Sequence, residues 1–266
     1  MGSCRSKATS QRHIASAVAA ALLAITITAC KTIQSDDSAG SYAMAAKAQN
    51  EADARSTVEA SGERYRAKPE DAQAAINYAQ GLRTAGRRQE AAAVLEQASM
   101  HNPKNMELLG AYGRALADVG NYQQALDVLS RAHTPDHPDW RILSVQGVVL
   151  DQMGQHDEAQ RYYATALKIV PDDPSVLSNL GLSYALSKDL VRAEMTLRRA
   201  MGRPRADARV RQNLALVVGL RGRFAEAESI ARSDLPPEIA AANVSYLRQM
   251  LAQQNDLHAA AAKPRS

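Results

Sequence analysis

The chain has 266 residues, a net charge of +4 and only 4% aromatic residues. This length allows one or two ordinary domains, and the alanine-rich, aromatic-poor composition favours helices that pack closely through small side chains. No basic tract dominates the sequence, so nucleic acid is not an expected partner.

The first 29 residues have the features of a secretory signal peptide. A basic start with Arg5, Lys7 and Arg12 precedes an apolar run over residues 14–27, which is too short to span a bilayer comfortably. Removal of residues 1–29 takes away these three basic residues and no acidic one, so the net charge falls to about +1. The charge of the precursor is therefore a poor guide to the partners of the mature chain.

Residues 27–30 (ITAC) end the apolar run and resemble the lipobox of bacterial lipoproteins, in which an aliphatic and two small residues precede a cysteine. The resemblance implies that diacylglycerol is attached to Cys30, that cleavage occurs before it and that the new amino terminus is acylated. Several acyl chains anchor a protein firmly where one chain is marginal. Lys31 favours the outer membrane under the sorting rule of enterobacterial lipoproteins, so we expect a lipoprotein that faces the periplasm, in either leaflet. Residues 30–41 are polar and small, as expected for a flexible tether.

Two other interpretations of the N-terminus stay open. Residues 1–6 (MGSCRS) also fit the myristoylation pattern, with Cys4 as a palmitoylation candidate, but this pattern leaves the apolar run and Cys30 unexplained. The apolar run could instead remain uncleaved as a membrane anchor. Both cysteines precede the predicted folded region, so we expect no internal disulfide in that region.

A 34-residue period runs through residues 72–241. In each of five units a glycine or a lysine is followed five residues later by alanine, and the period never slips. The first position is occupied by Gly86, Gly120, Gly154, Lys188 and Gly222, and the alanine by Ala91, Ala125, Ala159, Ala193 and Ala227. A further alanine recurs as Ala98, Ala132, Ala166 and Ala200, and only Asp234 breaks that series.

This pattern resembles the tetratricopeptide repeat. The resemblance implies an all-α, right-handed superhelical solenoid in which each unit forms two antiparallel helices, A and B. The glycine between the two apolar-periodic segments is expected to adopt the left-handed conformation that ends helix A. One such hairpin cannot bury its apolar face alone, so the units must stack. The units are predicted to span residues 72–105, 106–139, 140–173, 174–207 and 208–241.

Both ends of the repeat array are predicted to carry capping helices. Residues 42–71 form the N-terminal cap, a helix of low apolar content. Pro236 and Pro237 end the fifth unit early, and residues 238–253 follow as an amphipathic C-terminal cap. Residues 254–266 are predicted to form a disordered tail. The apolar side of the C-terminal cap consists of Ile239, Val244, Leu247 and Leu251.

The sequence contains no arrangement of residues that is typical of an enzyme or a metal site. His133 and His137 are four residues apart, but Pro135 and Pro138 place them in a loop, and a third ligand is missing. No glycine-rich phosphate loop or nucleophile elbow is present. We therefore expect no catalytic residue, metal, cofactor or small-molecule substrate.

Function is instead expected on the surface formed by the A helices. In tetratricopeptide-repeat proteins these helices line a concave face on which partner segments dock. By repeat register this face is polar and partly basic in the first units and apolar in the later ones. Two interpretations of the apolar stripe stay open: it accepts a helix or strand of a partner, or it is used internally, under the C-terminal cap or in packing between units. The polar positions are Gln80, Arg83, Arg114 and Asp118, and the apolar positions are Val148, Leu182, Leu186, Leu216 and Leu220.

Residues 178–251 carry a closer resemblance, to the C-terminal half of the TadD family, the tetratricopeptide lipoproteins of the tight-adherence (Flp pilus) assembly system. Its most specific part is residues 234–247 (DLPPEIAAANVSYL), where the repeat breaks and a helix follows. The resemblance implies a lipid-anchored scaffold that binds proteins of the pilus secretion machine, with a pilotin-like role toward the outer-membrane secretin. The alternative is a tetratricopeptide lipoprotein of another envelope pathway: a type IV pilus pilotin, an outer-membrane biogenesis scaffold or a regulator of a cell-wall enzyme.

Overall fold

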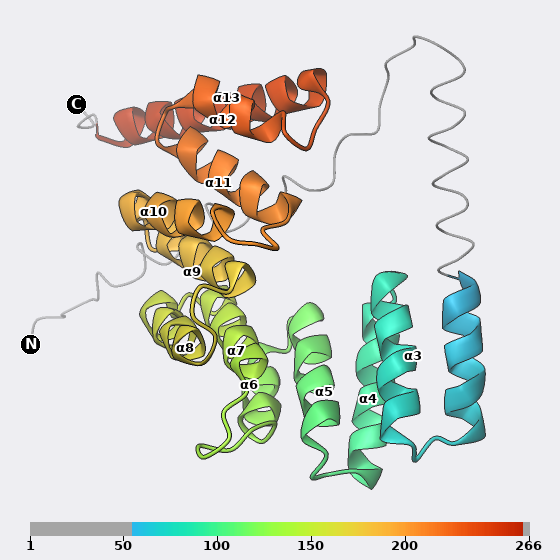
Figure 1. Ribbon diagram of the computed structural model, residues 1–266. Helices are drawn as coiled ribbons and strands as arrows, with labels where there is room; N and C mark the ends of the chain where they lie inside the picture. The colour runs from blue at the N-terminus through green and yellow to red at the C-terminus, as the bar shows by residue number, and fades with distance from the viewer. Residues whose placement is uncertain (1–54, 263–266) are drawn as a thin grey trace, which may run out of the picture. The chain divides into compact units, whose positions relative to one another are not determined.

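The structure, a computed structural model, describes residues 55–262, and the side chains of residues 55–254. Every regular element in this range is a helix, as the sequence predicts (Figure 1), and the strand-like pairing within it is an isolated bridge between Thr134 and His137. The predicted signal peptide (1–29), the lipidation site Cys30, the tether and the first part of the N-terminal cap lie outside the described residues.

The helices follow the 34-residue period of the sequence. The first helices of the predicted units, the A helices, each have 13 residues and start 34 residues apart, and the second helices, the B helices, keep the same spacing. The A helices are α3 (Ala72–Thr84), α5 (Met106–Asp118), α7 (Trp140–Gln152), α9 (Pro174–Leu186) and α11 (Ala208–Leu220). The B helices are α4 (Arg88–His101), α6 (Tyr122–Ser130), α8 (His156–Ile169), α10 (Leu190–Met201) and α12 (Phe224–Ala231). Residues 55–67 are helical before α3, and α13 (Pro237–Ala262) follows α12.

The chain divides into two compact units, with the boundary inside α9. The described part of the N-terminal unit, residues 55–179, contains α3 to α8, and that of the C-terminal unit, residues 180–262, contains α10 to α13. In the N-terminal unit each helix from α3 to α8 packs on the next, and α5 also touches α3 and α7. In the C-terminal unit α10 packs on α11, α11 packs on α12, and α13 packs on both α11 and α12.

In the three middle repeats, close approach of an A helix and its B helix depends on a glycine in the A helix. A Cβ atom at Gly147 would lie 2.6 Å from Cε1 of Tyr163, and one at Gly113 would lie 2.4 Å from Cγ of Leu129. Both distances are far below van der Waals contact, so the large side chain of the B helix fills the space that any other residue would need. The glycine and the large side chain that faces it therefore set the distance between the two helices of a pair.

Each A helix begins after an aspartate or asparagine, again at 34-residue spacing. The side-chain oxygen accepts hydrogen bonds from backbone N–H groups of the first turn, as Asp173 does from Ser175 and Val176 at 3.0 and 3.2 Å. Such caps provide acceptors for N–H groups that have no partner inside the helix, and each cap typically contributes about 1 kcal/mol to the stability of the folded protein. The five caps are Asp71, Asn105, Asp139, Asp173 and Asp207.

The A helices are followed by a residue in the left-handed conformation, which confirms the role predicted for the repeated glycine. The φ angle lies between +76° and +84° at Gly86, Gly120, Gly154 and Gly222. Lys188 occupies the same position with φ +67°, although its Cβ atom disfavours this conformation. The packing of the repeat therefore holds this position in the left-handed conformation even where the residue has a Cβ atom.

The helix over residues 55–67 covers the start of the repeat array. Val58 and Tyr65 are buried in it, and the ring of Tyr65 stacks on that of Tyr78 in α3, with 5.6 Å between ring centroids. A Cβ atom at Gly81 would lie 3.3 Å from Cγ2 of Val58, so the two helices are in direct contact. These contacts bury the apolar side of α3 that has no preceding repeat.

Helix α13 covers the other end through Ala240, Val244 and Leu247, which are buried. A Cβ atom at Gly219 would lie 2.5 Å from Cδ2 of Leu247, so α13 seats directly on α11. Of the four residues predicted to form the apolar side, Val244 and Leu247 are buried, whereas Ile239 and Leu251 are only partly buried.

The predicted disordered tail, residues 254–266, is wrong for residues 254–262, because α13 continues to Ala262. No proline or glycine interrupts the chain after Pro237 until Pro264, and the last four residues of the helix are alanine, the strongest helix former.

Replacing Lys188 with glycine should raise the free energy of unfolding by roughly 0.5–1 kcal/mol. Glycine removes the strain of a Cβ atom in the left-handed conformation, and this gain exceeds the extra backbone entropy that glycine loses on folding. The midpoint of urea unfolding, followed by circular dichroism, measures the change. Lys188→Ala is the matched control, since it removes the charge and keeps the Cβ atom. Equal midpoints for the glycine and alanine variants would contradict the strain at this turn.

Candidate interaction surface

The predicted interaction positions of the N-terminal unit lie on three neighbouring A helices. Gln80 and Arg83 are on α3, Arg114 and Asp118 are on α5, and Val148 is on α7. Because α5 touches both α3 and α7, we call these five residues the A-helix face.

Arg83 links two of the helices of this face. Its Nε donates to Oδ2 of Asp118 at 2.5 Å, and its Nη1 donates to Oε1 of Gln80 at 3.3 Å. Both charged side chains remain about one-third exposed, so the pair orients the groups and adds little stability. The structure thus brings together three of the predicted polar positions.

Arg114 is partly buried and makes no hydrogen bond or ion pair with any residue whose side chain the structure describes. Burial lowers the pKa of Arg114, and the charge of Arg83 lowers it further. Asp139 acts on this pKa in the opposite direction, and Arg141 again lowers it. The guanidinium stays protonated in proteins, so the A-helix face carries a positive charge with no direct partner.

Val148, in the same repeat register as Arg114, is the exposed apolar residue of this face, with 37% of its surface accessible. The other predicted apolar positions belong to the C-terminal unit, and each is partly buried. These residues are Leu182 and Leu186 on α9 and Leu216 and Leu220 on α11.

Helix α13 approaches this stripe at one end. Its Leu247 packs on Gly219, which lies between Leu216 and Leu220 in α11. The C-terminal cap therefore lies next to the last turn of α11, and the leucines remain candidates for partner contact.

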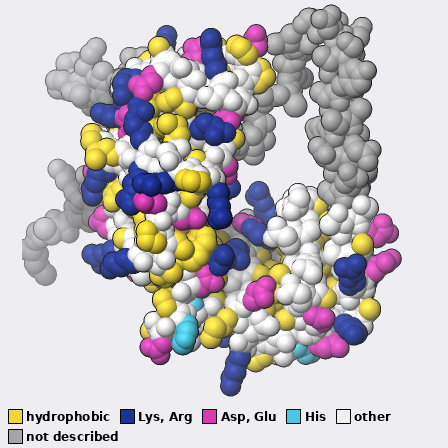
Figure 2. All heavy atoms as spheres, in the orientation of Figure 1, with side chains coloured by type: hydrophobic (Ala, Val, Ile, Leu, Met, Phe, Trp, Pro, Cys, Tyr) yellow, Lys and Arg dark blue, Asp and Glu magenta, His cyan; other side chains and the backbone are white. Residues whose placement is uncertain are grey.

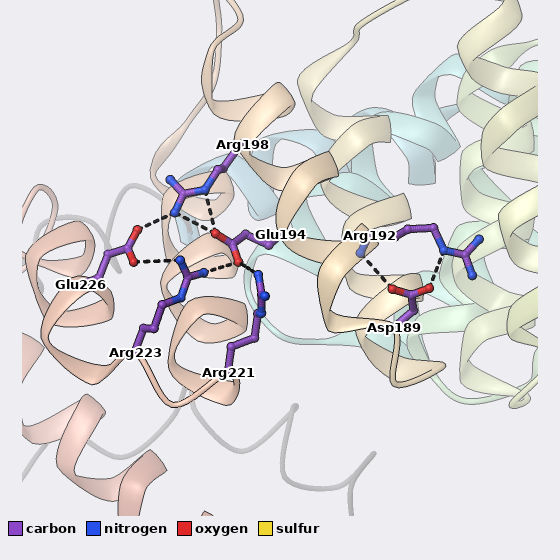
Figure 3. Close-up of polar contacts among 7 residues, drawn as sticks. All are labelled: Asp189, Arg192, Glu194, Arg198, Arg221, Arg223 and Glu226. Carbon is purple, nitrogen blue, oxygen red and sulfur yellow. Dashed lines mark hydrogen bonds and ion pairs between the residues drawn. The ribbon is translucent and has the colours of Figure 1, made fainter.

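A buried glutamate in the C-terminal unit gathers three arginines (Figure 3). Glu194, on α10 and 5% exposed, accepts hydrogen bonds from Arg198, Arg221 and Arg223. Arg198 and Arg223 also pair with Glu226 on α12. Charged side chains of both signs are interspersed over the visible surface of the described residues (Figure 2).

Burial by itself would raise the pKa of Glu194. Hydrogen bonds from Arg223, Arg198 and Arg221 act in the opposite direction and lower this pKa to about 2. The carboxylate is therefore ionised at any physiological pH, and it ties α10 to both ends of the turn between α11 and α12. Sequence analysis missed this cluster, since the arginines that flank Gly222 give no sign of a partner 27 or more residues away.

Asp234, which breaks the alanine series, forms a bidentate pair with Arg211. Its carboxylate accepts from Nε at 2.7 Å and from Nη2 at 2.5 Å, and the hydrogen bond with Arg211 lowers the pKa of Asp234. The substitution of alanine by aspartate is thus compensated by an arginine in α11 of the same repeat.

The described residues contain no group of three His, Cys, Asp or Glu side chains that could hold a metal ion. Among the helices within residues 55–262, none is both long enough and apolar enough to cross a membrane.

Two models of the tetratricopeptide-repeat family match the chain, one over residues 82–146 and the other over residues 145–208. No curated protein matches the sequence.

Solved structures of similar fold are distant in sequence. A tetratricopeptide-repeat protein from Parabacteroides merdae is 13% identical, with a TM-score of 0.65 over 75% of this chain and 80% of that chain. PilW, a widely conserved type IV pilus biogenesis factor, is 17% identical, with a TM-score of 0.62 over 76% of this chain and 94% of its own. A thermophilic protein of the same repeat class from Thermus thermophilus is 23% identical, with a TM-score of 0.58 over 66% of this chain and 100% of that one. These likenesses confirm the predicted all-α tetratricopeptide-repeat fold.

Replacing Glu194 with glutamine should lower the free energy of unfolding by about 2–3 kcal/mol at pH 7, since three arginines lose their shared carboxylate. A group whose pKa is lower in the folded chain stabilises the fold above its unfolded pKa, near 4.5, and this stabilisation is lost as the pH falls through about 2. The difference between wild type and variant, measured by urea unfolding at several pH values, should therefore shrink between pH 4.5 and pH 2. Glu63→Gln, at an exposed position, is the control and should show no comparable loss. A difference that is independent of pH would refute the assignment.

Proposed function

We propose that the chain, whose residues 82–208 match models of the tetratricopeptide repeat, is a lipid-anchored scaffold for assembly of the tight-adherence (Flp pilus) secretion system. Tetratricopeptide-repeat proteins bind other proteins, and their fold typically serves binding rather than catalysis. The observation that carries the scaffold function is the succession of helix pairs at constant 34-residue spacing from α3 to α12, which presents a series of A helices to partners.

Two features support the more specific role. The N-terminal sequence resembles a lipoprotein signal with Cys30 as the lipidation site, and residues 178–251 resemble the TadD family. The structure of the type IV pilus biogenesis factor PilW has a similar fold, although at 17% identity this likeness concerns the fold alone. A pilotin-like role toward the outer-membrane secretin suits an acyl anchor combined with a protein-binding face. The protein would then lie at the outer membrane and face the periplasm.

The second candidate is a tetratricopeptide lipoprotein of a different envelope pathway: a type IV pilus pilotin, an outer-membrane biogenesis scaffold or a regulator of a cell-wall enzyme. This candidate has the same lipid anchor and the same scaffold function as the first, but it binds a different partner protein. Identification of the bound proteins separates the two candidates directly.

The tagged full chain, extracted from membranes in mild detergent, is expected to co-purify with a secretin. In a strain that carries Cys30→Ser, the secretin should be lost from the preparation or mislocalised, and labelling with an alkyne-tagged fatty acid should disappear. Labelling that persists at Gly2 would favour myristoylation instead. Recovery of cell-wall enzymes without any pilus component would leave the scaffold intact and overturn the tight-adherence assignment.

Replacing Leu182 and Leu216 together with serine should weaken binding of the recovered partner at least tenfold, because a partner helix or strand would lose two apolar contacts. The melting temperature is expected to change by only a few degrees, since both side chains are partly exposed. Leu177→Ser and Leu214→Ser, at fully buried positions, are the controls and should lower it strongly. A drop as large as that of the controls would show that Leu182 and Leu216 are packing residues.

A further inference from the structure

Helix α10 differs from the other B helices in two side chains that it exposes. Val191 and Met195, one turn apart, are 55% and 67% accessible, whereas Ala193 and Leu197 on the other side of α10 are buried. At the same two positions of the repeat, the other B helices expose small or polar residues. These are Gln89 and Ala93 in α4, Gln123 and Asp127 in α6, Asp157 and Arg161 in α8, and Ala225 and Ser229 in α12. Packing of the repeats therefore does not require the apolar pair of α10.

Exposed arginines border this apolar pair. Arg192 and Arg199 lie on the same side of α10, and Arg203 and Arg205 follow in the turn that leads to α11. Nε of Arg192 donates to Oδ2 of Asp189 at 2.5 Å, which holds this guanidinium at the start of the helix (Figure 3). We call the exposed surface formed by Val191, Met195, Arg199, Arg203 and Arg205 the α10 face.

The C-terminal unit that carries the α10 face is basic. Residues 180–254 contain twelve basic and seven acidic side chains, a net charge of +5, whereas residues 55–179 contain 13 and 16, a net charge of −3. The excess is greatest at the end of α10, because residues 198–211 hold six arginines and one acidic residue, Asp207. The electrostatic field around the α10 face therefore attracts an anionic partner.

We propose that the α10 face binds the surface of an anionic phospholipid membrane. Val191 and Met195 enter the boundary between the headgroups and the acyl chains, and the arginines bind the lipid phosphates. Arginine side chains are long enough to keep the guanidinium among the headgroups while their apolar stems lie beside the inserted residues. Exposed apolar side chains bordered by basic ones on a single helix are typical of helices that lie in the membrane interface.

A bilayer suits the α10 face better than a protein or a nucleic acid. Two apolar side chains cover far less than the ~800 Å² that each partner buries in a stable protein interface. A nucleic acid would pair with the arginines and leave Val191 and Met195 in water. The inference goes beyond the proposed scaffold function and takes from it the lipid anchor at Cys30, which raises the local concentration so that a weak second contact suffices.

The test measures tryptophan quenching in the full chain, isolated with its anchor and reconstituted into vesicles of phosphatidylglycerol and brominated phosphatidylcholine. Trp140→Phe removes the single native tryptophan, and Met195→Trp places a reporter in the α10 face. Asp127→Trp, at the same position of the repeat in α6, is the matched control and has the same anchor. Bromine on the acyl chains quenches only a ring close to it, so quenching at Met195→Trp should exceed that of the control roughly threefold or more.

Arg203→Gln combined with Arg205→Gln should reduce quenching of the Met195→Trp reporter to nearly the control level, and so should vesicles without phosphatidylglycerol. Val191→Ser should also reduce it and leave the urea unfolding midpoint unchanged, since Val191 is exposed.

Equal quenching of the two reporters, or quenching that does not depend on phosphatidylglycerol, would overturn the proposal. Blue-shifted emission of the Met195→Trp reporter without quenching would show that a protein, or a second copy of this chain, covers the α10 face, and this would overturn it as well. Failure to recover a secretin, with the quenching result intact, would remove the tight-adherence assignment and leave the membrane contact standing.

Discussion

The packing of the three middle repeats, on which the rest of the array is stacked, depends on the contact between a glycine of the A helix and a large side chain of the B helix. A Cβ atom at Gly113, Gly147 or Gly181 would lie within 2.6 Å of a side-chain carbon of the facing B helix. The two helices can therefore lie closer together than ordinary side chains allow, and Tyr163 is almost completely buried as a result. Each pair then presents a continuous apolar side to the next unit, which no single hairpin could bury alone.

The buried carboxylates of Asp151 and Glu194 enter this packing in partnered sets. The hydroxyl of Tyr163 donates to Oδ2 of Asp151 at 3.0 Å, and Nδ1 of His156 lies 2.9 Å from the other oxygen of the same carboxylate. Burial, together with Asp151, raises the pKa of Tyr163, so its hydroxyl stays protonated and can donate this hydrogen bond. In the C-terminal unit, Glu194 satisfies the same requirement through Arg198 of its own helix and through Arg221 and Arg223 in the turn between α11 and α12. These sets replace apolar contacts with directional ones, and they specify which helices lie together.

The A-helix face differs from these sets in its charge balance. Arg83 is neutralised by a neighbouring helix, whereas Arg114 is not, although both occupy the second half of an A helix. A scaffold needs surfaces whose polar groups are incompletely satisfied in the free state, because a partner gains affinity from completing them. Under the proposed function, stability and binding are served by different residues of the same helices: glycine and large apolar side chains on the side that faces the B helix, and charged side chains on the other.

The sequence by itself determined the fold class, the 34-residue period and the left-handed turn after each A helix. These features depend on contacts between residues of the same repeat, and the residues that make such contacts recur every 34 positions in the sequence. The N-terminal caps at Asp71 and its equivalents obey the same period, but they were identified only in the structure. The tertiary structure alone decided which charges meet, because Arg211 with Asp234, and Glu194 with its arginines, join residues at separations that no period predicts. It also decided that Arg114 has no direct partner among residues 55–254, since the placement of Asp118 and Asp139 depends on how three A helices stack.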